Sequence, residues 1–377
     1  MFGGILVAFA IVDGNVQRNA DSEKITQGEI NVMKLVIRRA LLILFGLFIS
    51  IPMASATEKV TWNWAIYGPP RTVTVGFEHV AKFVKERSGG NFIINLRYNE
   101  QLSDAKDVLD GLKVGAFQGA MVAYSYAPAK TPLQGVLDMP FLPITNLIQL
   151  ERVQDAFEQW KPVADELARW NAIHFMTVLL PQYEFMGAGK PPRTIEDWKG
   201  MRVRALGGHG DAMKTLGAIP TSVAAPEVYT ALERGMFQAV AFPFAYAFTA
   251  YKLHEVSKWY TLGMHLGIIH NSINLSIDAW TALPAEYKKL LEDARAEAYV
   301  LQRSAYEDAD GKSIPLFEKK KLEIITITPQ IREELLARAG KPAWDQWVTN
   351  MERQGLPGKE AMELVMKLIK QHAGSGS

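Results

Sequence analysis

Hydrophobic positions between residues 60 and 123 switch between the periods of strands and of helices. Phe77, Val80, Ala81 and Val84 recur at the spacing of an amphipathic helix, whereas the flanking runs are short and rich in Val, Ile and Trp. The pattern predicts strands and helices in alternation, at residues 60–66, 72–88, 92–98, 103–115 and 119–123. Such alternation is typical of an α/β unit with a largely parallel sheet.

The same pattern starts again further along the chain and predicts a second α/β unit. Strands are expected near residues 202–204 and 239–242, with helices at 211–216 and 226–235. Other expected elements are helices at 147–171, 284–321 (with a bend or break at Gly311), 344–351 and 359–371, and strands at 173–180 and 322–327. No internal repeat is evident when the two units are compared as sequences.

The amino-terminal region has the pattern of an export signal. Residues 33–39 are basic, residues 40–53 form an apolar run that is short for a membrane span, and Ala54-Ser55-Ala56 fits a cleavage site. We predict a signal peptide at residues 33–56, cleavage after Ala56 and an exported mature protein, whose location the resemblance described below places in the periplasm; the alternative is an uncleaved anchor. Residues 1–32 are interpreted as an upstream extension and residues 373–377 as a flexible tail.

Composition excludes several classes of function. The 377 residues include 41 basic and 40 acidic side chains, and no basic run suggests a nucleic-acid partner. The absence of cysteine excludes a thiol nucleophile, a thiolate metal site and a disulfide framework. Because no zinc-protease, calcium-loop or hydrolase motif occurs either, we expect no metal, no cofactor and no catalytic residue.

Candidate binding chemistry lies in the segment that ends at Arg204. Arg202 and Arg204 occupy alternate positions of a predicted strand, so they are expected on one face of it. A guanidinium on a rigid strand suits bidentate capture of a carboxylate, although two solvated surface arginines are the alternative. Gly208 and His209 then precede a helix whose free amides would help to bind the same anion.

Six stretches in order resemble the solute-binding subunits of tripartite ATP-independent periplasmic (TRAP) transporters, the DctP-like family. They are Ser88-Gly89-Gly90 with Asn99-Glu100-Gln101-Leu102, then residues 112–115, 137–142, 195–204, 216–220 and 226–232. The resemblance implies an α/β, two-lobe periplasmic binding protein (Venus-flytrap) with crossing strands and a long lobe-spanning helix. It also implies that Arg204 pairs with the substrate carboxylate, that the partners are TRAP membrane subunits, and that the protein is a monomer.

On this interpretation the two lobes are discontinuous in sequence. Lobe I comprises residues 57–181 plus 268–310, and lobe II comprises residues 182–267 plus 311–372. Two other functions stay open at this point: an exported enzyme that acts on a carboxylate substrate, and a ligand-sensing partner of a membrane receptor.

Two departures from the family pattern point to the ligand. Relatives that bind polar sugar acids often carry a second arginine where this chain has Glu184 and an asparagine where it has Phe242. Aromatic residues are frequent instead at the expected cleft: Tyr183, Phe185, Phe242, Phe244 and Tyr246 from lobe II, and Trp64, Tyr67, Tyr124 and Tyr126 from lobe I. One arginine with aromatic walls suits an aromatic or hydrophobic monocarboxylate, and Glu184 would repel a second carboxylate if it faced the cleft. The alternative is that half of these aromatic residues belong to the core.

Overall fold

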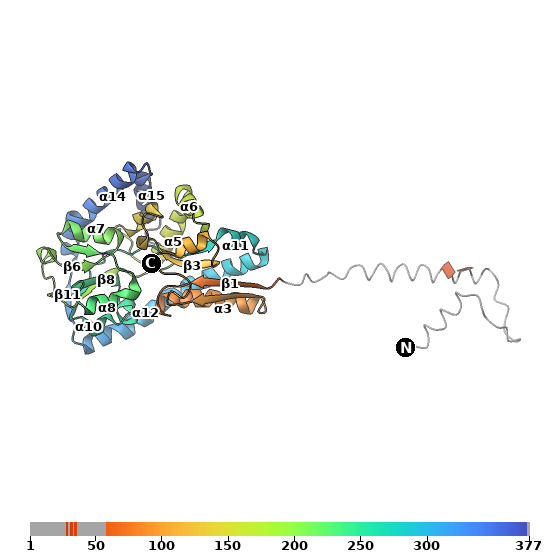
Figure 1. Ribbon diagram of the computed structural model, residues 1–377, viewed down its shortest axis with the longest axis horizontal. Helices are drawn as coiled ribbons and strands as arrows, with labels where there is room; N and C mark the ends of the chain where they lie inside the picture. The colour runs from red at the N-terminus through yellow and green to blue at the C-terminus, as the bar shows by residue number, and fades with distance from the viewer. Residues whose placement is uncertain (1–27, 29–30, 33, 36–57, 375–377) are drawn as a thin grey trace. The chain divides into compact units, whose positions relative to one another are not determined.

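The computed structural model describes residues 58–374, together with residues 28, 31, 32, 34 and 35 (Figure 1). The predicted upstream extension, signal peptide and cleavage site fall almost wholly outside this range. Residues from Glu58 onward form one compact unit. No helix among the described residues is both long enough and apolar enough to cross a membrane.

Two sheets divide this unit into two lobes, which confirms the predicted two-lobe α/β fold (Figure 1). The sheet of lobe I has the order β2-β1-β3-β10-β4, with β10 antiparallel to both neighbours. The sheet of lobe II has the order β11-β9-β5-β8-β6-β7, with β5 antiparallel to both neighbours. The strands are β1 Val60–Ala65, β2 Phe92–Arg97, β3 Gly119–Ala123, β4 Ala172–Thr177, β5 Tyr183–Gly187, β6 Arg202–Arg204, β7 Ile219–Thr221, β8 Ala239–Pro243, β9 Trp259–Leu262, β10 Asn271–Ser276 and β11 Glu323–Thr326.

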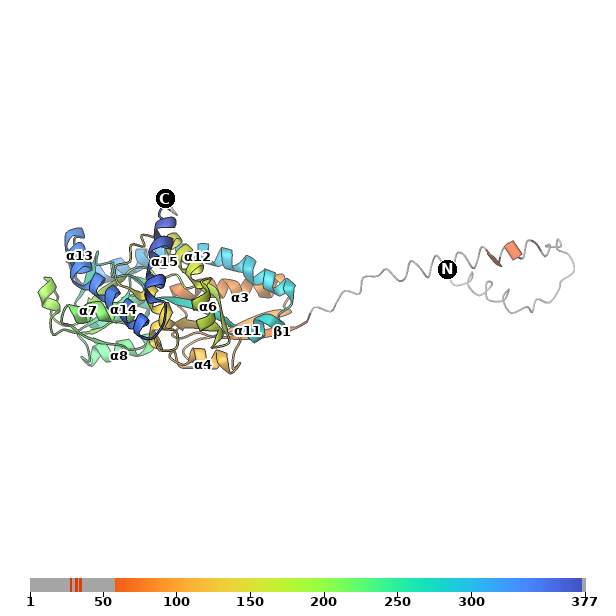
Figure 2. The same cartoon turned by 90° about the horizontal axis from the view of Figure 1, so that it is seen from above.

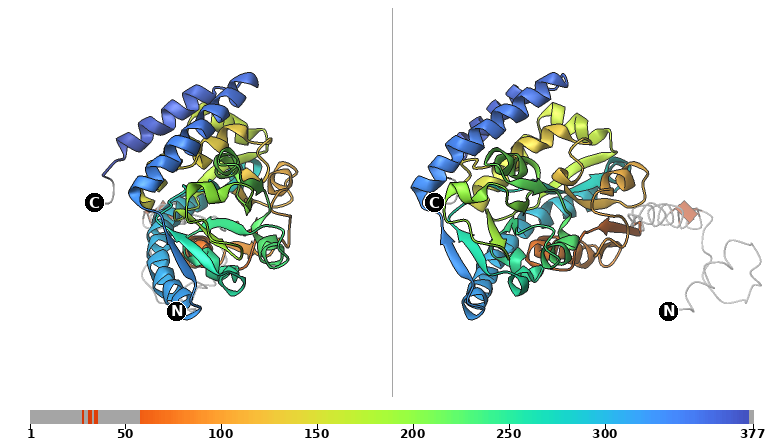
Figure 3. Two further views of the ribbon diagram at one scale, coloured as in Figure 1. Left: turned by 90° about the vertical axis from the view of Figure 1, so that its left-hand side faces the viewer. Right: turned by 60° about the vertical axis from the view of Figure 1, so that its left-hand side comes forward.

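Helices cover both sheets (Figures 1 and 3). They are α3 Val75–Arg87, α4 Val108–Lys113, α5 Leu147–Glu158, α6 Lys161–Ala168, α7 Gly207–Thr215, α8 Val228–Glu233, α9 Tyr246–Ala250, α10 Leu253–Val256, α11 Ile277–Ala282, α12 Ala285–Lys319, α13 Pro329–Leu335, α14 Lys341–Arg353 and α15 Gly358–Gln371. The helix expected over residues 147–171 is two helices, because Pro162 near the start of α6 lacks the amide needed to continue α5. The carboxyl-terminal α15 packs against α5 of lobe I, where Gln149 donates to the carbonyl of Ile369 at 2.9 Å.

The two lobes share a structural repeat that the sequence comparison missed. The orders β2-β1-β3-β10 and β7-β6-β8-β5 correspond, and a Gly-x-Phe-Gln segment precedes both β3 and β8. The glutamine plays the same part in each lobe: Gln118 accepts from the Asn63 amide of β1, and Gln238 accepts from the Arg202 amide of β6, both at 2.9 Å. The expectation of no internal repeat is therefore wrong for these segments.

Two crossing segments, residues 178–182 and 263–270, connect the lobes and lie side by side. The amide of Tyr183 donates to the carbonyl of Gly267 at 2.8 Å, and the amide of Leu266 donates to the carbonyl of Tyr183 at 3.0 Å. This backbone pairing holds the two crossing segments together.

The long helix α12 spans both lobes, as predicted, and runs beside α3 (Figure 2). On the lobe I side, Tyr299 donates to Asp155 at 3.0 Å. Near a crossing segment, Tyr306 donates to the carbonyl of Leu179 at 2.5 Å. On the lobe II side, Ser313 lies 2.8 Å from the hydroxyl of Thr249. The helix is continuous through Gly311, so of the predicted bend or break the break is wrong.

Candidate ligand-binding site

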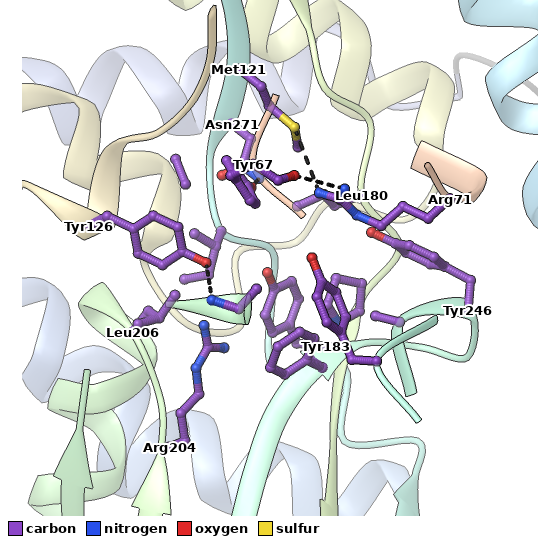
Figure 4. A pocket seen from close by; sticks show the side chains of 17 residues that line it. Tyr67, Arg71, Met121, Tyr126, Leu180, Tyr183, Arg204, Leu206, Tyr246 and Asn271 are labelled. Atoms are coloured by element: carbon purple, nitrogen blue, oxygen red, sulfur yellow. Dashed lines mark hydrogen bonds between the residues drawn. The ribbon is translucent and has the colours of Figure 1, made fainter. Parts of the chain in front are cut away.

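A pocket lies between the lobes, where β1, β3, β6 and β8 end (Figure 4). Ligands of open α/β sheets bind at the carboxyl ends of strands, and here two sheets present those ends to one space. The lining residues are Tyr67, Arg71, Met121, Ala123, Tyr126, Leu180, Tyr183, Arg204, Leu206, Ala225, Phe242, Pro243, Tyr246, Ala247, Tyr251, Ile269 and Asn271.

Arg204 points into this pocket from lobe II (Figure 4). Its side chain is 1% exposed, and its Nε and Nη1 donate to the carbonyls of Val223 and Ala241 at 3.0 and 2.9 Å. Within residues 58–374, Nη2 has no protein acceptor and the guanidinium forms no ion pair. Arg202 lies at the other end of β6, is exposed, and donates to the carbonyls of Met236 and Gly235. Only the carboxyl-terminal arginine of the pair therefore reaches the pocket.

Aromatic side chains form the walls around Arg204. The guanidinium carbon lies 4.4 Å from the centre of the Phe242 ring, and Tyr183, Tyr246 and Tyr67 also line the pocket. Burial raises the pKa values of these three tyrosines above their ordinary range, so the phenols are neutral hydrogen-bond donors. The structure thus brings together five of the ten predicted site residues: Arg204, Tyr183, Phe242, Tyr246 and Tyr67.

Trp64, Tyr124 and Phe244 do not line this pocket, which corrects their predicted role. Each comes from a strand or directly follows one, and its side chain turns into a lobe core. Trp64 is fully buried and packs edge-on against Phe175. Tyr124 lies 2.6 Å from the hydroxyl of Ser272 in a buried polar network of lobe I. Phe244 stacks on Tyr260 inside lobe II.

The repeat between the lobes explains which aromatic residue reaches the pocket. Tyr124-Ser125-Tyr126 follows β3, and Phe244-Ala245-Tyr246 occupies the corresponding place after β8. Tyr124 lies in a core cluster of lobe I and Phe244 is partly buried against the core of lobe II, whereas the third residue of each triplet lines the pocket. Both triplets are aromatic at the first and third positions, so their sequences alone do not tell core from pocket.

Gly208 and His209 lie behind the pocket rather than in it. A side chain on Gly208 would approach Met139 and the Asp138 carbonyl within 2.7 Å, so this position packs backbone against backbone. His209 is fully buried and its ring supports that of Tyr183, with centres 5.1 Å apart. Burial lowers the pKa of His209 to about 3, so it is an uncharged packing residue at neutral pH.

Glu184 also faces away from the pocket. Its carboxylate accepts hydrogen bonds from the Thr261 hydroxyl at 2.6 Å and from the amides of Gly263, Met264 and His265 at 3.0 to 3.2 Å. The expected repulsion between Glu184 and a second ligand carboxylate therefore has no structural basis. Glu184 instead stabilises the loop that leads from β9 into a crossing segment.

The pocket residues that the sequence did not single out include Arg71, Tyr251 and Asn271. Arg71 follows Gly68-Pro69-Pro70 just after β1, and its side chain turns back into the pocket. Asn271 donates to the Tyr67 hydroxyl at 2.9 Å. An arginine shortly after a strand end was a usable signal for Arg71, because both lobes place the carboxyl ends of their strands at the cleft.

Tyr126 forms a hydrogen bond that joins the lobes. Its hydroxyl accepts from the amide of Ala225 at 2.9 Å, and both residues line the pocket (Figure 4). Separation of the lobes would break this bond and expose the amide to water. The bond therefore favours the closed arrangement specifically.

Replacement of Tyr126 by phenylalanine is expected to weaken ligand binding by about two- to tenfold, mainly through faster dissociation. The variant leaves the Ala225 amide unpaired in the closed state, a cost of about 1 kcal/mol, whereas the open state can hydrate it. Stopped-flow measurement of tryptophan fluorescence, with the acid that stabilises the protein most, would follow the dissociation rate. An unchanged rate would show that this bond does not hold the lobes closed.

Asp138 is a buried carboxyl group behind the pocket. It accepts from the amide of His270 at 2.5 Å, and burial raises its pKa from 3.8 to about 8. The folded protein therefore binds the Asp138 proton more tightly than the unfolded chain does. This contribution to stability is fully present below about pH 4 and is lost as the pH rises through 8.

The Asp138→Asn variant is expected to lose less stability than the wild type as the pH is raised from 6 to 8. The difference should be roughly 1 kcal/mol per pH unit, because asparagine can still accept from His270 but does not titrate. Thermal unfolding of both proteins across this range would measure it. Parallel pH profiles would contradict the assignment of Asp138 as a protonated buried acid.

No group of three histidine or acidic residues within the described part of the chain lies close enough to hold a metal ion. The two pocket arginines and the phenols suit an anion rather than a cation. The geometry therefore describes a small anion-binding site with aromatic walls.

Comparison with known families identifies the class of protein. Residues 66–350 match the DctP model, described as bacterial extracellular solute-binding protein, family 7. Because this match covers well over half of the chain, the protein belongs to that family. The predicted resemblance to TRAP solute-binding proteins is confirmed.

Particular relatives show how broad the class is. The C4-dicarboxylate-binding periplasmic protein of Rhodobacter capsulatus is 26% identical over 258 residues, which cover 67% of this chain and 75% of that protein. A TRAP solute-binding protein from Rhodoferax ferrireducens, solved with copurified benzoate, has a TM-score of 0.75 at 20% identity and covers 84% of this chain and 100% of its own. One from Sulfitobacter with bound β-D-galacturonate has a TM-score of 0.71 at 18% identity, with coverage of 82% and 100%.

Proposed function

We propose that this protein captures a compact organic acid with an aromatic or apolar body in the cleft between its lobes. The ligand carboxylate binds Arg204, and the loaded protein delivers the acid to TRAP-type membrane subunits. The observation that carries this proposal is a guanidinium that is 1% exposed, forms no ion pair within residues 58–374, and points into the pocket between the lobes. Burial of such a charge without a partner is costly, so a ligand carboxylate and lobe closure favour each other.

The walls of the pocket support an aromatic or apolar ligand body. Phe242, Tyr183 and Tyr246 present ring surfaces beside Arg204. The space between these walls is small, about 30 Å³ for the centres of water-sized spheres, which favours a compact ligand over an extended one. The Rhodoferax structure contains benzoate in the same fold, whereas the Sulfitobacter structure contains a sugar acid, so the fold accepts both chemistries.

The expectation of a monocarboxylate rested on a single arginine in the cleft and on repulsion by Glu184, and the structure supports neither argument. Glu184 is bonded to a loop behind the pocket, and Arg71 adds a second guanidinium to the lining. The proposal therefore keeps the aromatic or apolar body and does not limit the number of acidic groups.

We also propose that the protein is exported, is a monomer, and releases its ligand chemically unchanged. The family match to extracellular solute-binding proteins supports capture and delivery, and the pocket lining offers no paired nucleophile and base. Copurification with TRAP membrane subunits would support delivery to a transporter. Copurification with a membrane receptor instead would favour the sensing alternative.

A thermal-shift screen tests the proposed ligand class. Benzoate, hydroxybenzoates and benzene dicarboxylates are expected to raise the melting temperature of the mature protein by several degrees, because a ligand at about a hundred times its Kd stabilises by about 2.7 kcal/mol. Succinate and galacturonate serve as polar comparisons. Stabilisation by the polar acids alone would contradict the proposed aromatic or apolar body.

A further inference from the structure

Arg71 brings a second guanidinium to the pocket, from lobe I (Figure 4). Its Nη1 donates to the carbonyls of Tyr67 and Pro69 at 2.9 and 2.8 Å, which fixes the side chain in place. The polar contact of Nη2 is with the sulfur of Met121 at 3.8 Å, and a thioether is a weak acceptor. The guanidinium therefore has donor capacity that the protein leaves largely unused.

The surroundings of Arg71 do not neutralise its charge. The rings of Tyr67 and Tyr251 lie 5.3 and 5.7 Å from the guanidinium carbon. Burial raises the pKa values of both tyrosines, so neither supplies a negative charge at neutral pH. No acidic residue lines the pocket, and no ion pair within residues 58–374 includes Arg71.

Two fixed positive charges thus face one small space from opposite lobes. Arg204 is held by carbonyls of lobe II and Arg71 by carbonyls of lobe I. A ligand with one carboxylate would pair with Arg204 and leave Arg71 opposite an uncharged ring. A ligand with two carboxylates would pair with both and would draw the two lobes together.

We propose that Arg71 is a second recognition residue and that the preferred ligand is a compact dicarboxylic acid with an aromatic or apolar centre. One carboxylate binds Arg204 and the other binds Arg71. This inference rests on the proposed function and extends it, because it assigns the second acidic group and the residue that reads it. It also makes lobe closure depend on the ligand, since each end of the ligand is held by a different lobe.

Calorimetric titration with matched acids tests this proposal. The probes are benzoate and the 1,2-, 1,3- and 1,4-benzenedicarboxylates, with hexanoate and adipate as a flexible pair. At least one dicarboxylate is expected to bind the wild type about tenfold or more tightly than its matched monocarboxylate, as for a charge-assisted hydrogen bond. The best isomer would also report the separation of the two guanidinium groups.

Three variants assign the preference to Arg71. Arg71→Met is expected to lower dicarboxylate affinity about tenfold more than monocarboxylate affinity and so to remove the dicarboxylate advantage, whereas Arg71→Lys keeps part of the advantage. The matched control is Arg295→Met, because Arg295 is a lobe I arginine that bonds the carbonyl of Phe175 and does not line the pocket. Its affinities should equal those of the wild type. Melting temperatures of all variants would exclude unfolding as the cause.

The inference and the proposed function fail in different ways. Monocarboxylates that bind the wild type as tightly as every dicarboxylate, or a dicarboxylate advantage that survives in Arg71→Met, would overturn the role of Arg71 alone. Failure of every acid to bind the wild type would overturn the proposed function together with this inference.

Discussion

Replacement of Arg204 by methionine is expected to weaken binding of the best organic acid by at least about a hundredfold. Methionine keeps much of the buried volume but removes the only lobe II cation in the pocket lining. The ligand carboxylate would then be buried without its charged partner, and loss of one member of such a pair costs about 2–5 kcal/mol. Titration calorimetry on the variant and the wild type measures the difference directly.

Arg202→Met is the matched control for this prediction. Arg202 lies on the same strand, two residues away, but is exposed and bonds the carbonyls of Gly235 and Met236 outside the pocket. Its replacement should change ligand affinity by less than about threefold, as expected of a side chain that touches no ligand. Equal losses in the two variants would mean that the strand as a whole, rather than Arg204, governs binding.

The second large effect is on stability rather than on binding. Glu184→Ala is expected to lower the free energy of unfolding by about 2–4 kcal/mol, because it leaves the Thr261 hydroxyl and three loop amides without their common acceptor. Chemical denaturation of the mature protein would measure this loss. Glu196→Ala provides the control, because Glu196 is an exposed acid paired with Arg338 at the surface, and its removal should leave stability unchanged.

The Glu184→Ala variant also tests whether Glu184 anchors the loop or repels a second ligand carboxylate. As a loop anchor, it should leave the ratio of dicarboxylate to monocarboxylate affinity as it is in the wild type. A large gain in dicarboxylate affinity in Glu184→Ala would restore the sequence-based view that Glu184 repels a second carboxylate.

The sequence predicted elements whose hydrophobic period is long and regular. The helices α3, α12 and α15, the early strands of lobe I and the strand of Arg204 were found within a few residues of their observed bounds. Strands β5, β9 and β10 were missed, because they are stabilised by pairing with distant segments and not by a regular local pattern. β10 pairs with β3 and β4, which lie about a hundred residues or more earlier in the chain.

Half of the predicted site residues line the pocket, and the other half were misplaced because the direction of a side chain also depends on distant contacts. Arg204 stands out because an arginine in a buried strand needs a partner. Tyr124 and Phe244 were assigned to the pocket because they follow strands, but the chain turns at these positions. The third residues of the two triplets, Tyr126 and Tyr246, line the pocket, and both were among the aromatic residues expected there. Arg71 was missed because it lies in a loop, where no periodic pattern gives the direction of a side chain.

Native mass spectrometry of the purified mature protein, followed by denaturation and identification of the released small molecule, tests the central claim most directly. The account predicts a compact organic acid in the wild type and in Arg202→Met, and its absence from Arg204→Met. Retention of the same acid by Arg204→Met, or release of a nucleotide or a metal ion in place of an acid, would contradict it.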